Sequence, residues 1–136
     1  MPPPADPSTL PDWLAGPEPL LELPGGSDPA AVLDALRHGS LDAQHVDLVG
    51  VADKAMLLDR LHQALGFGAW FGFNWDALEE ALFGPENRSG PERVLVVTGF
   101  EGFRERDPAA AEVFVDILRT VARTPGSGLR GAVLVH

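Results

Sequence analysis

Residues 70–84 read WFGFNWDALEEALFG and join an aromatic-glycine turn to a short helical pattern. Three carboxylates, those of Asp76, Glu79 and Glu80, fall within five residues of this pattern. No lysine or arginine occurs between Gly68 and Asn87. An acidic surface with aromatic neighbours is poorly suited to holding substrate phosphates, because it repels them. It is well suited to meeting a positively charged partner, whose approach its field favours.

The helix expected in this segment has clear boundaries and two distinct faces. Asn74 is a favourable N-cap, and the pair Gly84-Pro85 cannot continue a helix. At about 100° per residue, one face carries the apolar side chains that we expect in the core: Trp75, Leu78 and Leu82. The opposite face carries the carboxylates, and Phe83 projects into the middle of their arc.

The outer face of this helix has two interpretations. An aromatic side chain ringed by carboxylates, such as that of Phe83, suits an interface anchor, yet Phe83 could equally tuck under residues 84–92. Asp76 is favourable near a helix N-terminus through the helix dipole alone, by a few tenths to about 1 kcal/mol. Exposed glutamates on a helix are usually just solvated. The pattern by itself therefore leaves open an interaction surface and an ordinary solvated face.

Length and composition restrict the classes of protein. A chain of 136 residues suits one domain, with an apolar content sufficient for a packed core. The absence of cysteine excludes disulfides, thiolate catalysis and zinc sites with cysteine ligands. No apolar run approaches the roughly 20 residues of a membrane span, and the proline-rich start does not resemble a signal peptide. We therefore expect a cytoplasmic protein without membrane contact or cofactor.

The net charge of −10 is unevenly distributed. Residues 1–44 hold seven acids and one base, whereas residues 74–87 hold four acids and no base. The remainder of residues 45–136 balances, with nine acids and nine bases. Because phosphate affinity rests on lysine and arginine, direct nucleic-acid binding is not expected. A basic protein partner is expected instead.

The chain divides into three parts by composition. Residues 1–19 hold seven prolines and predict a flexible or polyproline-like tail, from which Trp13 and Leu14 could still dock on the domain. Residues 20–44 form an N-terminal extension with a possible strand at 20–23 and a helix that begins at Asp28-Pro29. Residues 45–136 carry the main domain.

The pattern of the main domain predicts an α/β fold. Strands are expected at 46–51, 93–98 and 132–135, and helices are expected to begin at Asp53, Asn74 and Asp107. Residues 101–104 with Arg106 are interpreted as a polar loop. The run at 93–98 is continuously apolar, which is typical of a strand covered on both faces. This order predicts a small parallel sheet of about three strands packed with helices.

The acidic segment resembles the barstar family, which inhibits barnase-type ribonucleases inside the cell. The resemblance rests on an aromatic-aromatic-Gly-x-Asn-x-Asp-Ala-Leu-x-acid-Ala-Leu pattern. It is matched here by Trp70, Phe71, Gly72, Asn74, Asp76, Ala77, Leu78, Glu80, Ala81 and Leu82. The strand at 46–51, the helix with Leu61-His62-Gln63, and the later elements fall in the family's order. The resemblance covers about residues 45–136, and residues 1–44 have no counterpart.

The resemblance implies a non-catalytic, barstar-like inhibitor that occludes the active site of a basic, extracellular-type ribonuclease, as a monomer in a 1:1 complex. The helix carboxylates would stand where substrate phosphates bind. The partner-binding residues that it implies are Trp70, Phe71, Gly72, Phe73, Asn74, Asp76, Glu79, Glu80 and Phe83.

Four positions depart from the family pattern. Glu80 stands where the family has its most important contact Asp, and Trp70 stands in place of a stacking Tyr. Glu79 replaces an aromatic residue. Thr120 is the nearest residue to a further contact acid that has no match.

Two other functions remain open at this point. The fold could be an interaction module for a different basic protein. Alternatively, Asp76, Glu79 and Glu80 could hold a hard metal or act as an acid/base pair in a hydrolase, although such sites need further oxygen ligands and often histidine. His45, His62 and His136 are not at ligand spacing to this helix, and His62 is interpreted as a surface or boundary residue. No metal site is therefore predicted.

Overall fold

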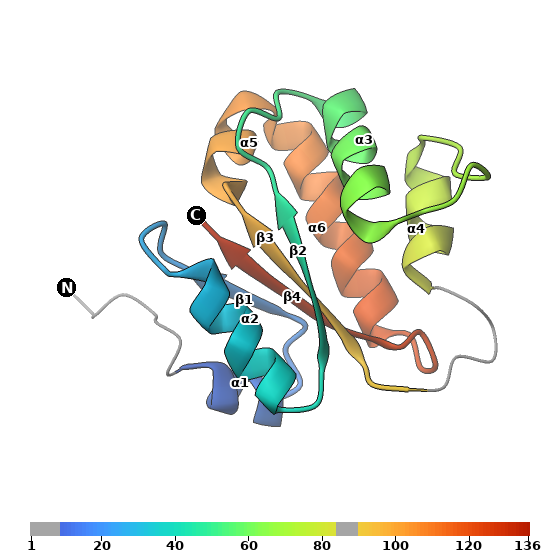
Figure 1. Ribbon diagram of the computed structural model, residues 1–136. Coiled ribbons are helices and arrows are strands. Elements are labelled where there is room, and N and C mark those ends of the chain that lie inside the picture. Colours follow the sequence, from blue (N-terminus) through green and yellow to red (C-terminus); the bar gives the residue numbers. More distant parts are fainter. Residues whose placement is uncertain (1–8, 84–89) are drawn as a thin grey trace.

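The computed structural model describes residues 9–83 and 90–136 (Figure 1). Ten elements follow one another along the chain: α1 (Leu10–Ala15), β1 (Leu20–Leu23), α2 (Pro29–His38), β2 (Asp42–Asp47), α3 (Lys54–Leu65), α4 (Trp75–Phe83), β3 (Arg93–Thr98), α5 (Phe100–Arg106), α6 (Pro108–Arg123) and β4 (Leu129–Val135). None of the described helices is long and apolar enough to cross a membrane.

The strands form one parallel sheet in the order β1-β4-β3-β2. The predicted α/β fold with a parallel sheet is confirmed, with four strands where about three were expected. The additional strand is β1, which pairs with β4 from Leu20↔Ala132 to Leu23↔Val135. The N-terminal extension therefore supplies an edge strand to the sheet of the main domain.

Helices cover both faces of the sheet (Figure 1). Helices α1 and α2 pack on one face, where Val94 and Val96 of β3 are buried. Helices α3 to α6 cover the other face, where Leu95 and Val97 are buried. Alternate residues of β3 thus enter two separate cores, which explains why Val94 to Val97 are apolar without interruption.

Short polar side chains begin four of the helices as the sequence predicts. Asp28, Asp53 and Asp107 each accept a hydrogen bond from a backbone N–H in the first turn of α2, α3 and α6. Asn74 does the same for α4. At the far end of α3, Gly66 takes a left-handed conformation (φ 68°) and its N–H bonds to the carbonyl of His62. These caps satisfy backbone groups that the helices leave without partners.

The strand expected at 46–51 is displaced: β2 spans Asp42–Asp47. The Asp47 carboxylate accepts from the N–H of Val49, and the N–H of Val51 bonds to the carbonyl of Leu48. Gly50 has a positive φ of 83°. These bonds fold the residues after Asp47 into a turn in which Leu48 and Val51 are buried and Val49 is exposed, so the pattern that resembled a strand belongs partly to a loop.

The prediction of a polar loop around Glu101 is wrong, because Phe100–Arg106 form helix α5. Phe100 and Phe103 are fully buried beneath it. The helix starts at Gly99, which has a φ of 69° and provides no side-chain cap. A side chain on Gly99 would meet the backbone of Val49 at 2.9 Å, so the close approach of two loops requires glycine there.

The tail expected at 1–19 contains a helix in its described part. Within α1, Leu10 and Trp13 are buried in the core that α1 and α2 form with the sheet. Residues 1–8 lie outside the described residues. A register shift in β4 turns Arg130 toward α1. The Arg130 guanidinium lies 4.5 Å from the Trp13 ring and donates to the carbonyls of Trp13, Gly16 and Glu18.

Candidate protein-interaction site

The segment between α3 and α4 is a tightly bonded turn, which we name the aromatic turn (residues 66–74). The N–H of Phe71 bonds to the carbonyl of Gly68 at 3.1 Å, and the N–H of Phe67 bonds to the carbonyl of His62. The Asn74 amide donates to the carbonyl of Gly72 while its oxygen caps α4. The turn is therefore fixed to both helices that flank it.

Helix α4 faces the core as the helical projection predicts. Leu78 and Leu82 are fully buried, and Trp75 is half-buried against the same core. The ammonium of Lys54 lies 5.2 Å from the centre of the Trp75 ring. This packing fixes the rotation of the helix, and with it the direction of its carboxylates.

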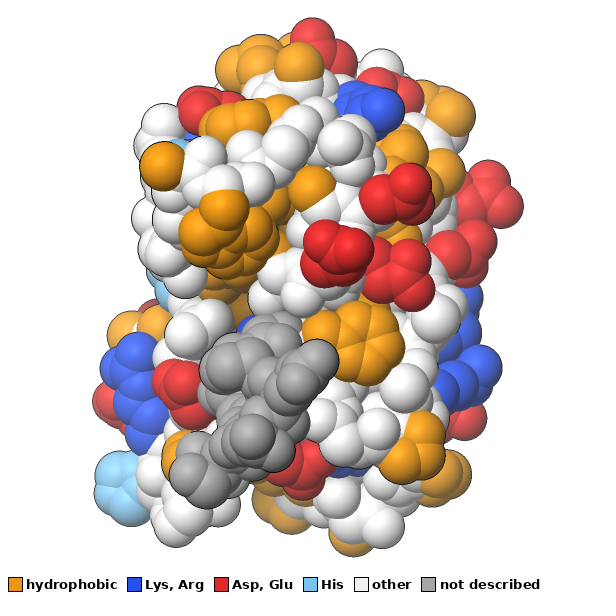
Figure 2. Space-filling view, turned by 90° about the vertical axis from the view of Figure 1, so that its right-hand side faces the viewer, with side chains coloured by type: hydrophobic (Ala, Val, Ile, Leu, Met, Phe, Trp, Pro, Cys, Tyr) orange, Lys and Arg blue, Asp and Glu red, His pale blue; other side chains and the backbone are white. Residues whose placement is uncertain are grey.

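The outer face of α4 carries the three carboxylates. Asp76 and Glu80 are exposed, whereas Glu79 is half-buried. Within residues 9–83 and 90–136, none of the three makes a hydrogen bond or ion pair. Figure 2 shows acidic side chains gathered on this side of the molecule beside hydrophobic ones. Three like charges are therefore left to solvent on one short helix.

The aromatic side chains of the turn differ sharply in exposure. Trp70 is 66% exposed and Phe73 is 47% exposed, which is unusual for side chains of this size. Phe71, which was expected among the partner-binding residues, is only 4% exposed. Its ring lies 5.0 Å from that of Phe67 and 4.9 Å from that of Phe73, so it supports the turn from below. Gly72 and Asn74 are exposed beside it.

Phe83 does not stand free among the carboxylates. It is half-buried and packs against the core that lies between the sheet and helices α3 to α6. The sequence left open whether Phe83 is an exposed anchor or a covered side chain, and in the structure it is partly covered. Whether residues 84–89 cover it falls outside the described residues, as does the predicted stop at Gly84-Pro85. Thr120, named as the nearest match to a contact acid, is exposed on α6.

Arg93 is a residue of this region that sequence reasoning did not single out. It is only 6% exposed, and its guanidinium donates to the carbonyls of Leu82 and Ser127. Because Leu82 lies in the last turn of α4, the guanidinium satisfies a carbonyl at the helix C-terminus. The available signal was a lone charged residue at the start of an otherwise apolar strand.

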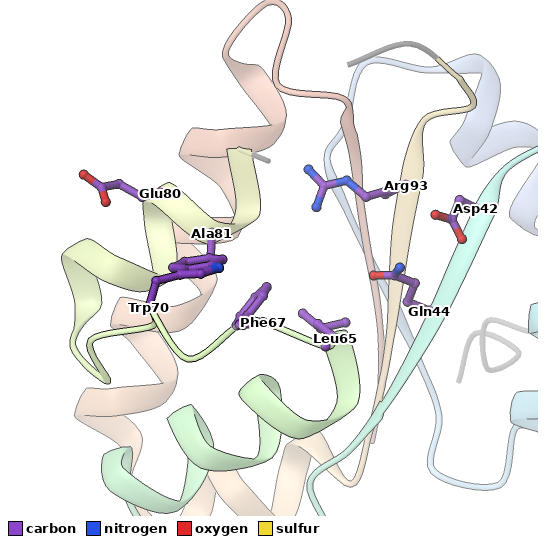
Figure 3. A pocket seen from close by; sticks show the side chains of 10 residues that line it. Asp42, Gln44, Leu65, Phe67, Trp70, Glu80, Ala81 and Arg93 are labelled. Atoms are coloured by element: carbon purple, nitrogen blue, oxygen red, sulfur yellow. The ribbon is translucent and has the colours of Figure 1, made fainter. Parts of the chain in front are cut away.

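A hollow of about 680 Å³ lies beside the aromatic turn (Figure 3). Trp70, Phe67 and Leu65 line one side, and Asp42 and Gln44 of β2 line the other. Figure 3 shows Arg93 reaching from β3 toward α4, whereas Glu80 points away from the hollow. The carboxylates of α4 therefore address the outer surface rather than an enclosed pocket.

The carboxylates do not form a metal centre in the structure. Among the residues that are described, no group of three or more histidine, aspartate or glutamate side chains is arranged to hold an ion. His62 is partly buried under the aromatic turn rather than lying on the free surface. The arrangement offers an exposed acidic and aromatic surface on a well-anchored scaffold.

Comparison with known proteins bears on this surface. No curated protein matched the chain. A family model described as Barstar (barnase inhibitor) matches residues 41–132, which include every element from β2 to α6, the aromatic turn among them, and the first residues of β4. Since the match covers more than half of the chain, this protein belongs to the Barstar (barnase inhibitor) family.

Proposed function

We propose that this chain is a non-catalytic inhibitor that binds a barnase-type ribonuclease and occludes its active site. The contact surface would be the aromatic turn together with the outer face of α4. A ribonuclease of this type must bind RNA phosphates through basic residues, and carboxylates can occupy the same places. The family match supports a ribonuclease partner, and the surface supplies the chemistry that such a partner requires.

The observation that carries the proposal is that Asp76, Glu79 and Glu80 have no partner within the described chain. Carboxylates with a structural role are bonded, as Asp28, Asp53 and Asp107 are at their helix starts. Three adjacent carboxylates without a partner repel one another and contribute little to folding. A basic protein partner would give them the hydrogen bonds and counter-charges that they lack.

Exposed aromatic side chains beside the carboxylates complete the surface. Trp70 and Phe73 are the two most exposed aromatic residues in the described chain. Aromatic side chains at the centre of an interface, with charge around them, often provide most of the binding free energy. We therefore assign Trp70 and Phe73 to the centre of the contact, and Asp76, Glu79 and Glu80 to its charged border.

Competition with RNA tests this function. The chain is titrated into a fixed concentration of a barnase-type ribonuclease that cleaves a fluorogenic RNA substrate. We expect inhibition that is complete at one inhibitor per enzyme and that becomes weaker as the RNA concentration rises. Binding without inhibition of cleavage would instead support an interaction module that has another function. Absence of binding to any ribonuclease of this type would contradict the proposal.

A further inference from the structure

His62 lies on the last turn of α3, directly beneath the aromatic turn. Its ring is 5.7 Å from that of Phe71, with planes inclined by only 11°. The same ring is 5.0 Å from that of Phe73, at 55°. Because Phe71 and Phe73 also contact each other at 4.9 Å, the three rings form a closed cluster. The half-exposed Phe73 therefore rests on two rings below it.

His62 also bonds to the beginning of the aromatic turn. Its Nε2 lies 3.3 Å from the carbonyl oxygen of Gly68. Since a carbonyl oxygen can only accept, Nε2 carries the proton and donates it. The same carbonyl accepts the N–H of Phe71. One imidazole therefore contacts the turn on both sides of Trp70, at Gly68 before it and at Phe73 after it.

The backbone at Phe73 needs such support. Its φ of 52° is left-handed, which is uncommon for a residue with a side chain. A conformation of this kind persists only where the surroundings hold it in place. The ring contacts with His62 and Phe71 provide that hold, immediately before the cap at Asn74.

Trp70 benefits from this arrangement. Its ring lies at the edge of the aromatic cluster, 6.2 Å from Phe67 and 6.3 Å from Phe71, and most of its surface is exposed. An exposed aromatic residue binds a partner more tightly when its backbone is already fixed, because less conformational entropy is lost.

We infer that His62 is the positioning residue of the binding surface: its ring fixes the aromatic turn and thereby presents Trp70 and Phe73 to the ribonuclease. This inference rests on the proposed function for the identity of the partner. His62 does not touch the partner; it acts through Phe71, Phe73 and Gly68. The ring contacts provide most of the effect, because the bond to Gly68 is long and that carbonyl has a second donor.

Three variants of the full chain separate these contributions. His62→Ala removes the ring and the donor, whereas His62→Phe keeps a ring but removes the donor. His38→Ala removes an exposed histidine from α2, on the opposite face of the sheet, and serves as the control. The indole N–H signal of Trp70, identified by its loss in Trp70→Phe, reports the turn by nuclear magnetic resonance without any partner.

We expect His62→Ala to shift or broaden the Trp70 indole signal while the signals of Trp13 and Trp75 stay in place. Dissociation from a barnase-type ribonuclease should become about 10-fold faster or more. The association rate and its salt dependence should not change, because no charge on the contact surface is altered. The dissociation rate of His62→Phe should stay within about 3-fold of that of the parent chain, and the dissociation rate of His38→Ala should equal that of the parent chain.

An unchanged Trp70 signal in His62→Ala would overturn the inference, whatever the ribonuclease does. It would also be overturned if the signal changed while dissociation stayed the same, or if His62→Phe lost as much binding as His62→Ala. If the parent chain binds no ribonuclease, the proposed function fails on its own, and the indole signal alone decides whether His62 positions the turn.

Discussion

Arg93 begins β3, and its guanidinium is almost completely buried between α4 and the loop that precedes β4. Few charged side chains are buried to this extent unless their hydrogen bonds are satisfied. Two carbonyl groups, those of Leu82 and Ser127, accept from it. One side chain thus joins the helix that carries the carboxylates to β3, an interior strand of the sheet.

Replacing Arg93 with methionine keeps most of the side-chain volume but leaves both carbonyls without this donor. We expect the free energy of unfolding to fall by about 2–4 kcal/mol, the usual range when a buried hydrogen-bonded charge is lost. Urea denaturation measures it. Arg123→Met, at an exposed position on α6, is the control and should change stability by less than about 0.5 kcal/mol. Equal effects of the two substitutions would contradict the role of Arg93.

At the scale of elements, α1 depends on a contact that is distant in sequence. Arg130 donates to the carbonyl of Trp13 in this helix and to those of Gly16 and Glu18 after it, and its guanidinium lies over the ring of Trp13. A helix of six residues is not stable by itself in water. The bonds from Arg130, together with burial of Leu10 and Trp13, therefore hold α1 in place.

Arg130→Ala should release α1 while the sheet remains folded. We expect backbone amides of residues 10–15 to exchange hydrogen at least 10-fold faster, whereas those of β3 stay protected. Arg130→Lys should recover only part of the protection, because an ammonium cannot donate to three carbonyls in the geometry of a planar guanidinium. Unchanged exchange of α1 in Arg130→Ala would show that apolar burial alone holds the helix.

The elements that the sequence predicts well are those whose signals are local. Helices α2, α3, α4 and α6 begin with a capping side chain, and the strand at 93–98 has an uninterrupted apolar run from Val94 to Val97. Helix α5 begins at a glycine without a side-chain cap, so its start has no local signal. The position of β2 follows from pairing with β3, and α1 depends on a residue more than 100 positions away. Such contacts have no trace in a short window of sequence.

The candidate site shows the same division. The direction of Trp75, Leu78 and Leu82 followed from helical geometry alone, and the structure confirms it. The burial of Phe71 and the position of His62 could not be predicted from helical geometry, because they arise where α3 packs beneath the aromatic turn. Phe83 was ambiguous in sequence, since its direction on the helix lies between the two faces.

At the scale of the whole molecule, charge is the dominant property. The net charge of −10 would attract a basic ribonuclease from a distance. We expect the association rate to fall at least 10-fold between roughly 20 mM and 500 mM salt, because the Debye length shortens from about 20 Å to a few ångströms. Stopped-flow mixing at several salt concentrations measures this rate. A rate that does not depend on salt would contradict steering by charge.

The proposed function requires that the outer face of α4, rather than net charge in general, binds the ribonuclease. It is tested by the double variant Asp76→Asn with Glu80→Gln, which removes two charges and keeps side-chain shape. The control, Glu105→Gln with Glu112→Gln, removes two exposed acids from α5 and α6 and has the same net charge.

The decisive measurement is the dissociation constant for a barnase-type ribonuclease, determined for both double variants and the parent chain at one salt concentration. We expect the α4 variant to bind at least about 30-fold more weakly, corresponding to roughly 2 kcal/mol, and the control to stay within about 3-fold of the parent chain. Equal weakening of the two variants, or full affinity in the α4 variant, would contradict the proposed function.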